Sequence, residues 1–235
     1  MAVRLLVLPG VFRPISDSHL LAEAVSEHVR PGSSMLDVCT GSGLLAVTAP
    51  ARAAVATAVD VSRRAVTCAR LNGALNGVRV RGRRGSLLEP VAGERFDLIA
   101  SNPPYVPSAE EELPDRGPRR AWDAGLDGRV LLDRLIAEAP DHLHPGGSLL
   151  LTQSTIIGEA ETLRRLAEAG LEADVLTRRE GPLGPLMRSR RDHLVAAGLL
   201  APDQDTEEVL IIRGRRPAAG ARRVAARSSA AAHST

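Results

Sequence analysis

The residues best suited to chemistry are Asn102-Pro103-Pro104-Tyr105, which directly follow a short apolar run at residues 96–101. The run predicts a buried strand, and two prolines without backbone N–H groups end it and stiffen the turn. The turn therefore lies at the carboxyl end of a strand, where open α/β sheets bind their ligands. A fixed amide, a rigid carbonyl and an aromatic ring are together well suited to hold a planar –NH2 group while its nitrogen attacks an electrophile.

A glycine turn, Gly41-Ser42-Gly43, follows an earlier apolar run that contains Asp37. Glycine lets the backbone approach a ligand closely, and the next helix favours negative groups at its N-terminus. Asp60 ends the following predicted strand, 17 residues after Gly43, where an acid can accept both hydroxyls of a ribose. A nicotinamide cofactor is one alternative, because the dinucleotide fingerprint tolerates the alanine at its third glycine position. The amide turn favours S-adenosylmethionine instead.

Together these motifs resemble those of the HemK-type protein glutamine-N5 methyltransferases, within the class I S-adenosylmethionine-dependent methyltransferases. The resemblance extends from about residue 9 to residue 212. It implies a Rossmann-like, doubly wound sheet of seven mostly parallel strands whose last strand is antiparallel. It also implies methyl transfer to a glutamine of a class I release factor. The segments that carry the resemblance are residues 9–14, 16–18, 37–43, 60–66, 85–90, 96–107 and 125–128.

The proposed chemistry assigns roles to individual residues. We expect the Asn102 side-chain oxygen and the Pro103 carbonyl to accept the two N–H bonds of the substrate amide, which aims the nitrogen lone pair at the methyl group. Tyr105 is expected to pack on the amide plane. Further substrate contacts are expected from Pro104, Phe12 and Trp122. The residues expected to bind the cofactor are Asp37, Thr40, Gly41, Gly43, Asp60, Val61, Ser86, Leu87 and Asn102.

Two features depart from the family pattern. Bacterial release-factor enzymes of this family carry a helical substrate-docking domain before the catalytic domain, and only some 30 residues precede the first core strand here. The chain is closer to the short form of eukaryotes and archaea, which implies a small zinc-binding activator as a partner. Ser86 stands where the family usually has an Asp that accepts from the adenine amino group. We therefore expect the backbone N–H of Leu87 to carry more of adenine recognition.

Other functions compete with glutamine methylation. Adenine N6 and guanine N2 are also planar amines, so a nucleic-acid methyltransferase is an alternative, as is a small-molecule N-methyltransferase. The scarcity of aromatic residues, 2% of the chain, argues against base stacking and hence against nucleic-acid methylation. A non-catalytic cofactor-binding protein is disfavoured because Asn102 and Tyr105 are both present.

The elements that position these residues alternate between strand and helix patterns, which predicts a parallel sheet covered on both faces. Residues 16–18 offer N-cap chemistry for the first helix, and a loop at 106–128 ends in a glycine-flanked run that could form a lid with Trp122 and Asp123. A turn is predicted at residues 144–147. The predicted strands are 3–8, 35–39, 55–59, 78–81, 96–100, 148–153, 173–177 and 207–212. The predicted helices are 16–29, 44–51, 62–75, 129–139, 158–169 and 186–197.

Composition bounds the remaining choices. All 30 basic residues are arginine. Residues 213–235 hold six arginines and no acid, which leaves a charge of −4 on the rest of the chain. This negative charge argues against nucleic-acid binding by residues 1–212. No apolar run of membrane-spanning length and no secretory leader are present, so we expect a cytoplasmic protein. We divide the chain into a substrate-side segment packed on the core (1–30), a methyltransferase domain (31–213) and a basic, disordered tail (214–235).

The remaining candidate side chains predict no further chemistry. Cys39 and Cys68 have neither zinc-site spacing nor a disulfide framework, so we expect two small buried residues. His142 and His144 lie two positions apart and do not share a helix face, which disfavours a metal site. The arginines at 178, 179, 188, 190 and 191 predict a solvated face.

Overall fold

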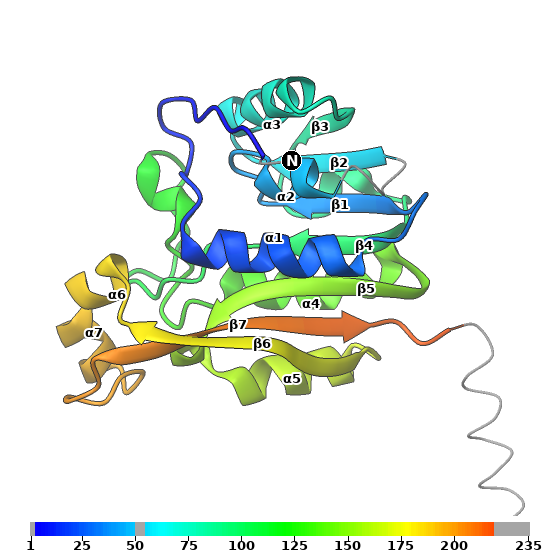
Figure 1. The fold of residues 1–235 in the computed structure, drawn as a ribbon. Helices are drawn as coiled ribbons and strands as arrows, with labels where there is room; N and C mark the ends of the chain where they lie inside the picture. Colours follow the sequence, from blue (N-terminus) through cyan, green and yellow to red (C-terminus); the bar gives the residue numbers. More distant parts are fainter. Residues whose placement is uncertain (1–2, 50–54, 219–235) are drawn as a thin grey trace, which may run out of the picture.

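A computed structural model describes residues 3–49 and 55–218, and these residues form a seven-stranded sheet with helices on both faces (Figure 1). The strand order is β3-β2-β1-β4-β5-β7-β6, with β1 to β5 parallel and β7 antiparallel to both of its neighbours. The predicted doubly wound sheet is confirmed. The strands are β1 (Ser34–Val38), β2 (Val55–Asp60), β3 (Val80–Arg84), β4 (Phe96–Ser101), β5 (Leu143–Ser154), β6 (Glu172–Pro182) and β7 (Thr206–Arg215).

Helices α1, α2 and α3 cover one face of the sheet, while α4 and α5 cover the other (Figure 1). The strands feed both layers, because successive residues point to opposite faces. Met35 packs with α1, for example, whereas Leu36 packs with α4. Apolar side chains on both faces are what a parallel sheet requires. The helices are α1 (Ser16–His28), α2 (Leu44–Thr48), α3 (Arg63–Leu75), α4 (Val130–His142), α5 (Glu159–Glu168), α6 (Pro185–Ser189) and α7 (Arg191–Ala196).

Residues 3–8 form no strand, contrary to the prediction. They run along α3, where side-chain amides replace a partner strand. Asn72 donates to the Leu6 carbonyl at 2.8 Å and accepts from the Leu6 N–H at 2.7 Å. Asn76 makes the matching pair with Arg4, at 2.7 and 2.9 Å. The apolar character of the segment suggested a strand, but the backbone groups of Arg4 and Leu6 are instead satisfied by two asparagines one helical turn apart.

Several boundaries differ from the prediction. Residues 144–147 belong to β5, where a register shift against β4 absorbs them. The predicted helix at 186–197 is two short helices, α6 and α7. Strand β7 continues to Arg215, so the tail begins later than residue 214. Residues 50–51 of the second predicted helix and residues 219–235 of the predicted tail lie outside the described residues. Within the described residues, none of the helices has the length and apolarity needed to cross a membrane.

We expect Asn72→Ala to lower the free energy of unfolding by about 1–3 kcal/mol, because the fully buried amide also donates to the Ser42 carbonyl. Asn76→Ala removes an analogous pair in a more exposed position and should cost less than about 1 kcal/mol. Urea unfolding of both variants checks the ranking. Equal losses would contradict the role of Asn72 as the buried anchor of the N-terminal segment.

Candidate active site

One continuous pocket of about 240 Å³ lies at the carboxyl ends of β1, β2 and β4. The glycine turn, the end of β2, residues 10–15 and the turn after β4 all contribute to its wall. Every residue predicted to bind cofactor or substrate lines this pocket, with the exception of Gly43. The sheet topology therefore brings together four segments that are far apart in the sequence.

Gly43 acts through packing instead of through the pocket wall. It has a φ of 84°, and a Cβ there would lie 2.6 Å from the Cα of Ala69 on α3. Only glycine permits that approach with that backbone conformation. Cys39 and Leu87 also have left-handed φ values, of 57° and 43°, and both line the pocket. Such backbone strain is typical of ligand sites.

Asp60 fastens the glycine turn to the end of β2. Its carboxylate accepts from the Gly41 N–H at 3.0 Å and from the Ser62 N–H at 2.8 Å. Burial raises the pKa of Asp60, and these two backbone hydrogen bonds oppose the rise. The carboxylate keeps further lone pairs that can accept from a ligand in the pocket.

Asp37 is 1% exposed, and one of its carboxylate oxygens is unpartnered among the described residues. Oδ2 accepts from the Thr40 hydroxyl at 2.6 Å and from the Ala46 N–H at 3.0 Å. Oδ1 is buried and receives no hydrogen bond from any part of the chain that the structure describes. Burial raises the pKa of Asp37 to about 7. An orphaned acceptor in a pocket wall is a site for a donor, and a ligand amine supplies one.

The Asn102 amide is held in one orientation. Nδ2 donates to the Ser18 hydroxyl at 3.1 Å and to the Asp17 carboxylate at 3.3 Å. Because a carboxylate only accepts, the amino side of Asn102 must face Asp17. Oδ1 then receives no hydrogen bond from the described residues, and Asn102 lines the pocket. The amide oxygen is thereby left as the group that can accept from a ligand.

Tyr105 shares the same anchor. Its hydroxyl donates to the Asp17 carboxylate at 2.9 Å. Burial and then the charge of Asp17 raise the pKa of Tyr105 well above its ordinary value, so the phenol stays protonated and donates. Asp17, only 5% exposed, lies in the first turn of α1, where the helix dipole stabilises a negative charge.

Sequence reasoning gave residues 16–18 a helix-capping role and a place in the substrate-side segment, and the structure corrects the capping role. The N-cap of α1 is Ile15, without a side-chain hydrogen bond, so Asp17 and Ser18 are free to turn toward the amide of Asn102. The only sequence feature that pointed to this role was the acidic residue Asp17, because the family resemblance places its segment on the substrate side. Nothing in the sequence pairs Asp17 with a turn 85 residues later.

The wall beside Tyr105 comes from the insertion between β6 and β7. Leu186 of α6 lines the pocket together with Trp122. Asp123, 1% exposed, lies between Arg119 at 2.6 Å and Arg190 at 2.5 Å. Arg190 joins the insertion to the loop after the turn, since it also donates to a backbone carbonyl of that loop at 2.6 Å. The predicted solvated arginine face is wrong for this residue.

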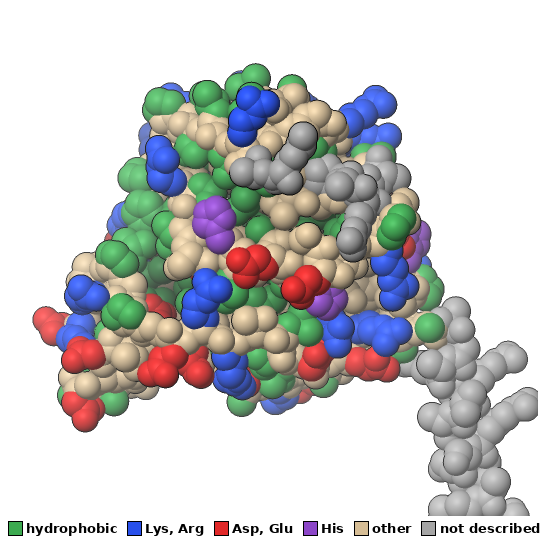
Figure 2. Space-filling view, viewed as in Figure 1, with side chains coloured by type: hydrophobic (Ala, Val, Ile, Leu, Met, Phe, Trp, Pro, Cys, Tyr) green, Lys and Arg blue, Asp and Glu red, His purple; other side chains and the backbone are tan. Residues whose placement is uncertain are grey.

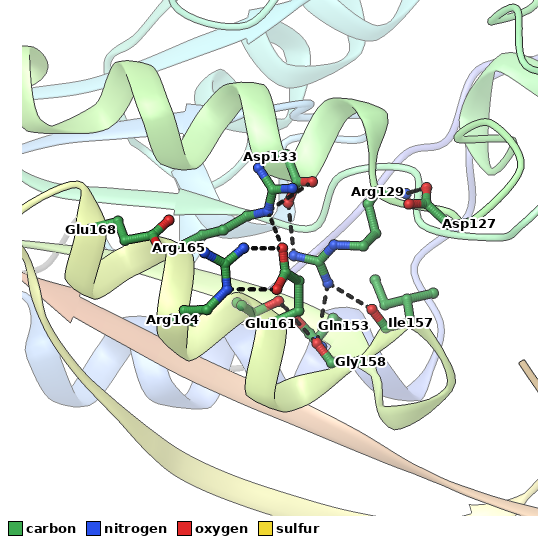
Figure 3. A network of polar contacts seen from close by, with 11 residues as sticks. Asp127, Arg129, Asp133, Gln153, Ile157, Gly158, Glu161, Arg164, Arg165 and Glu168 are labelled. Atoms are coloured by element: carbon green, nitrogen blue, oxygen red, sulfur yellow. Dashed lines mark hydrogen bonds and ion pairs between the residues drawn. The ribbon is translucent and has the colours of Figure 1, made fainter.

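The glycine run at 125–128 supports the turn from behind. A Cβ at Gly128 would lie 2.5 Å from the Tyr105 carbonyl oxygen, so the run is packed tightly against the turn. Arg129 then donates to the Ile157 carbonyl at 2.6 Å and pairs with Asp133 at 2.7 Å (Figure 3). Close packing explains these glycines, which the lid prediction did not anticipate. The described residues contain no group of three His, Cys, Asp or Glu side chains able to hold a metal ion.

Known proteins similar to this chain are methyltransferases. Residues 2–114 match the family described as "Methyltransferase small domain". The "Putative protein N5-glutamine methyltransferase" of Methanocaldococcus jannaschii is 34% identical over 186 residues, which cover 79% of this chain and 93% of that protein. A release factor glutamine methyltransferase of Geobacter sulfurreducens is 36% identical over 67% of this chain, but the match spans only 57% of that enzyme.

A solved structure shows the same fold. The E. cuniculi Mtq2–Trm112 complex, described as responsible for methylation of the eRF1 translation termination factor, superposes with a TM-score of 0.62 at 23% identity. The match covers 88% of this chain and 99% of that chain. With the archaeal relative matched over nearly its full length, the chain belongs to the family of protein N5-glutamine methyltransferases, which are S-adenosylmethionine-dependent enzymes of class I fold.

Proposed function

We propose that this protein methylates the side-chain nitrogen of a glutamine in a translation release factor, in the cytoplasm. The single observation that carries the proposal is the fixed amide of Asn102, whose oxygen remains available in the pocket while its nitrogen is bound to Asp17 and Ser18. The names of the bacterial relative and of the solved complex support the choice of a release factor.

The pocket residues fit S-adenosylmethionine. Asp60 can accept from the ribose hydroxyls, and the orphaned Oδ1 of Asp37 can accept from the amino group of the methionine portion. Ser86 and Leu87 line the pocket where we place the adenine. When bound, this cofactor supplies a sulfonium methyl group, which is a strong electrophile.

The protein's part in the reaction is positioning. An amide nitrogen is a poor nucleophile, because its lone pair is delocalised into the carbonyl. Asn102 Oδ1 and the Pro103 carbonyl would accept the two N–H bonds of the substrate and hold the nitrogen in place. These acceptors bind more strongly as positive charge develops on nitrogen, so they favour the transition state.

The pocket wall near Asn102 and Pro103 is largely apolar, which favours the exclusion of water. Tyr105, Trp122 and Leu186 present ring and aliphatic surface to the pocket. Tyr105 and Trp122 also pack against the apolar cluster formed around Leu183, Met187 and Leu194. Because low-polarity walls strengthen each hydrogen bond inside, the two acceptors act in a favourable environment.

A small activator subunit, of the zinc-binding kind, is also proposed as a partner. The solved complex with Trm112 supports it. Expression of this chain alone and together with a candidate small zinc protein from the same genome tests the proposal. A soluble, fully active chain without any partner would contradict it.

The acceptor class is tested by incubating the purified protein with methyl-labelled S-adenosylmethionine and cell lysate. We expect label that protease releases and nuclease does not, and a recombinant release factor should accept it. Label that only nuclease releases would overturn the protein-glutamine assignment. Mass spectrometry of the labelled peptide then identifies the modified side chain.

Asn102→Ala should lower kcat by about 10²–10³, by analogy with the removal of one preorganised hydrogen bond. The dissociation constant for S-adenosylmethionine should change little, because Asn102 is only one of the nine residues expected at the cofactor site. The ribose, amino and adenine groups are assigned to Asp60, Asp37, Ser86 and Leu87. Single-turnover transfer and calorimetry measure the two quantities separately. Loss of cofactor affinity in step with turnover would sink the assigned role.

Asp17→Ala should lower kcat by about tenfold or more while cofactor affinity is kept, since the Asn102 amide becomes free to rotate. Tyr105→Phe removes only the hydroxyl and leaves the bonds of Asn102 intact, so its effect should be smaller. The comparison separates positioning of the amide from packing of the ring. An Asp17→Ala enzyme with unchanged kcat would refute the positioning role.

Asp37→Asn should change the pH dependence of stability. The folded pKa of Asp37, about 7, lies above its ordinary value of 3.8, so ionisation of this group destabilises the cofactor-free protein as pH rises through that interval. The variant should gain stability relative to the wild type between those pH values and keep a constant advantage above them. Urea unfolding from about pH 5 to pH 8 measures this, and a difference independent of pH would contradict it.

A further inference from the structure

Positive charge is concentrated on the α3–β3 edge of the molecule. Residues 61–88 contain seven arginines and no acid. In Figure 2 the upper part of the molecule, over α3 and β3, shows arginines without a visible Asp or Glu, whereas acids and arginines are mixed below. We call this surface the arginine face. Its arginines are Arg63, Arg64, Arg70, Arg79, Arg81, Arg83 and Arg84.

The charge of this face is almost uncompensated. Among the described residues only Arg83 has an acidic partner, Glu94 at 2.7 Å. Arg64, Arg70 and Arg84 donate to backbone carbonyls, and these bonds leave their charge in place. By contrast, many arginines on α4, α5, β6 and β7 form ion pairs with carboxylates. The mild net charge of the chain therefore conceals a strong local field.

The chemistry of the face fits phosphates. Strand β3 forms the edge of the sheet, so its outer side is open. Leu71 and Leu75 are the large apolar side chains exposed on α3, and no aromatic residue lies between residues 61 and 88. Arginine also occurs in protein interfaces, but there it usually accompanies aromatic anchors, and this segment has none. Phosphate-backbone binding needs positive charge without base-stacking rings, and it is independent of sequence because every nucleotide carries the same phosphate.

We propose that the arginine face binds RNA through its phosphate backbone. The face borders the cofactor pocket, because Val61, Ser62 and Gly85 line that pocket and flank the arginines. RNA bound there lies beside the adenine side of the pocket, away from the amide turn. The RNA is thus a docking partner and not the methyl acceptor. This inference stands on the charge distribution and does not require the proposed substrate.

The test measures the binding of the full chain to a fluorescein-labelled RNA hairpin by anisotropy at about 50 to 200 mM KCl. The variant neutralises three arginines that make no side-chain hydrogen bond to described residues: Arg63→Gln, Arg79→Gln and Arg81→Gln. Its affinity at about 100 mM salt should fall by about tenfold or more. The steepness of the slope of log K against log salt should fall by about 2 to 3, since three phosphate contacts are lost.

A matched control carries the same change of charge on other faces: Arg164→Gln, Arg178→Gln and Arg213→Gln. Its affinity should stay within about twofold of the wild type, since those side chains are ion-paired and lie on α5, β6 and β7, toward the opposite edge of the sheet from β3. A third variant, Arg222→Gln, Arg223→Gln and Arg227→Gln, addresses the arginines of the C-terminal segment. Unchanged S-adenosylmethionine binding verifies that each variant is folded.

Three outcomes would overturn the proposal. The first is wild-type affinity in the α3–β3 variant, which would leave those arginines as charges that merely protect a sheet edge. The second is loss of binding in the C-terminal variant without loss in the α3–β3 variant. The third is competition by poly-L-glutamate as effective as competition by unlabelled RNA at equal charge, which would indicate an acidic protein as the partner.

Discussion

The orientation of one amide governs this site. Asp17 can only accept hydrogen bonds, so it holds the amino side of Asn102 and the hydroxyl of Tyr105 and leaves the amide oxygen of Asn102 toward the pocket. The prolines between those two residues remove the freedom of the turn. Asp17 is fixed in its turn by α1, which packs on the sheet through Leu21 and Val25. Burial of an apolar helix face thus determines the direction of an acceptor.

The cofactor side relies on a different balance. Asp37 and Asp60 are two acids placed in a poorly solvated crevice, and burial is the largest influence on the pKa of each. Hydrogen bonds from Thr40, Ala46, Gly41 and Ser62 only partly compensate that burial. A site that is incompletely satisfied when empty gains more when a ligand brings donors. Local polar strain of this kind is the common cost of a preorganised pocket.

The fold determines how the charged residues are distributed over the surface of this protein. The count over the body of the chain is mildly acidic, which argued against nucleic acid. The fold places α3 beside β3 at one edge of the sheet, so an acid-free segment becomes a continuous face. The acids that balance the count lie on other elements, where they pair with their own arginines. The net charge of the chain therefore does not describe the local charge of the one face that a partner contacts.

The sequence by itself determined the alternation of strands and helices, the glycine turn, the position of Asp60 and the rigid amide turn, because each depends on residues close together in the chain. The tertiary structure alone decided which side of the Asn102 amide faces the ligand, through Asp17 and Ser18. It also decided the clamp of Asp123 by Arg190 and the docking of residues 3–8 on Asn72. These contacts join segments 66 to 85 residues apart. Local propensity carries no signal about such pairs, since only the packing of helices on the sheet brings them within hydrogen-bonding distance.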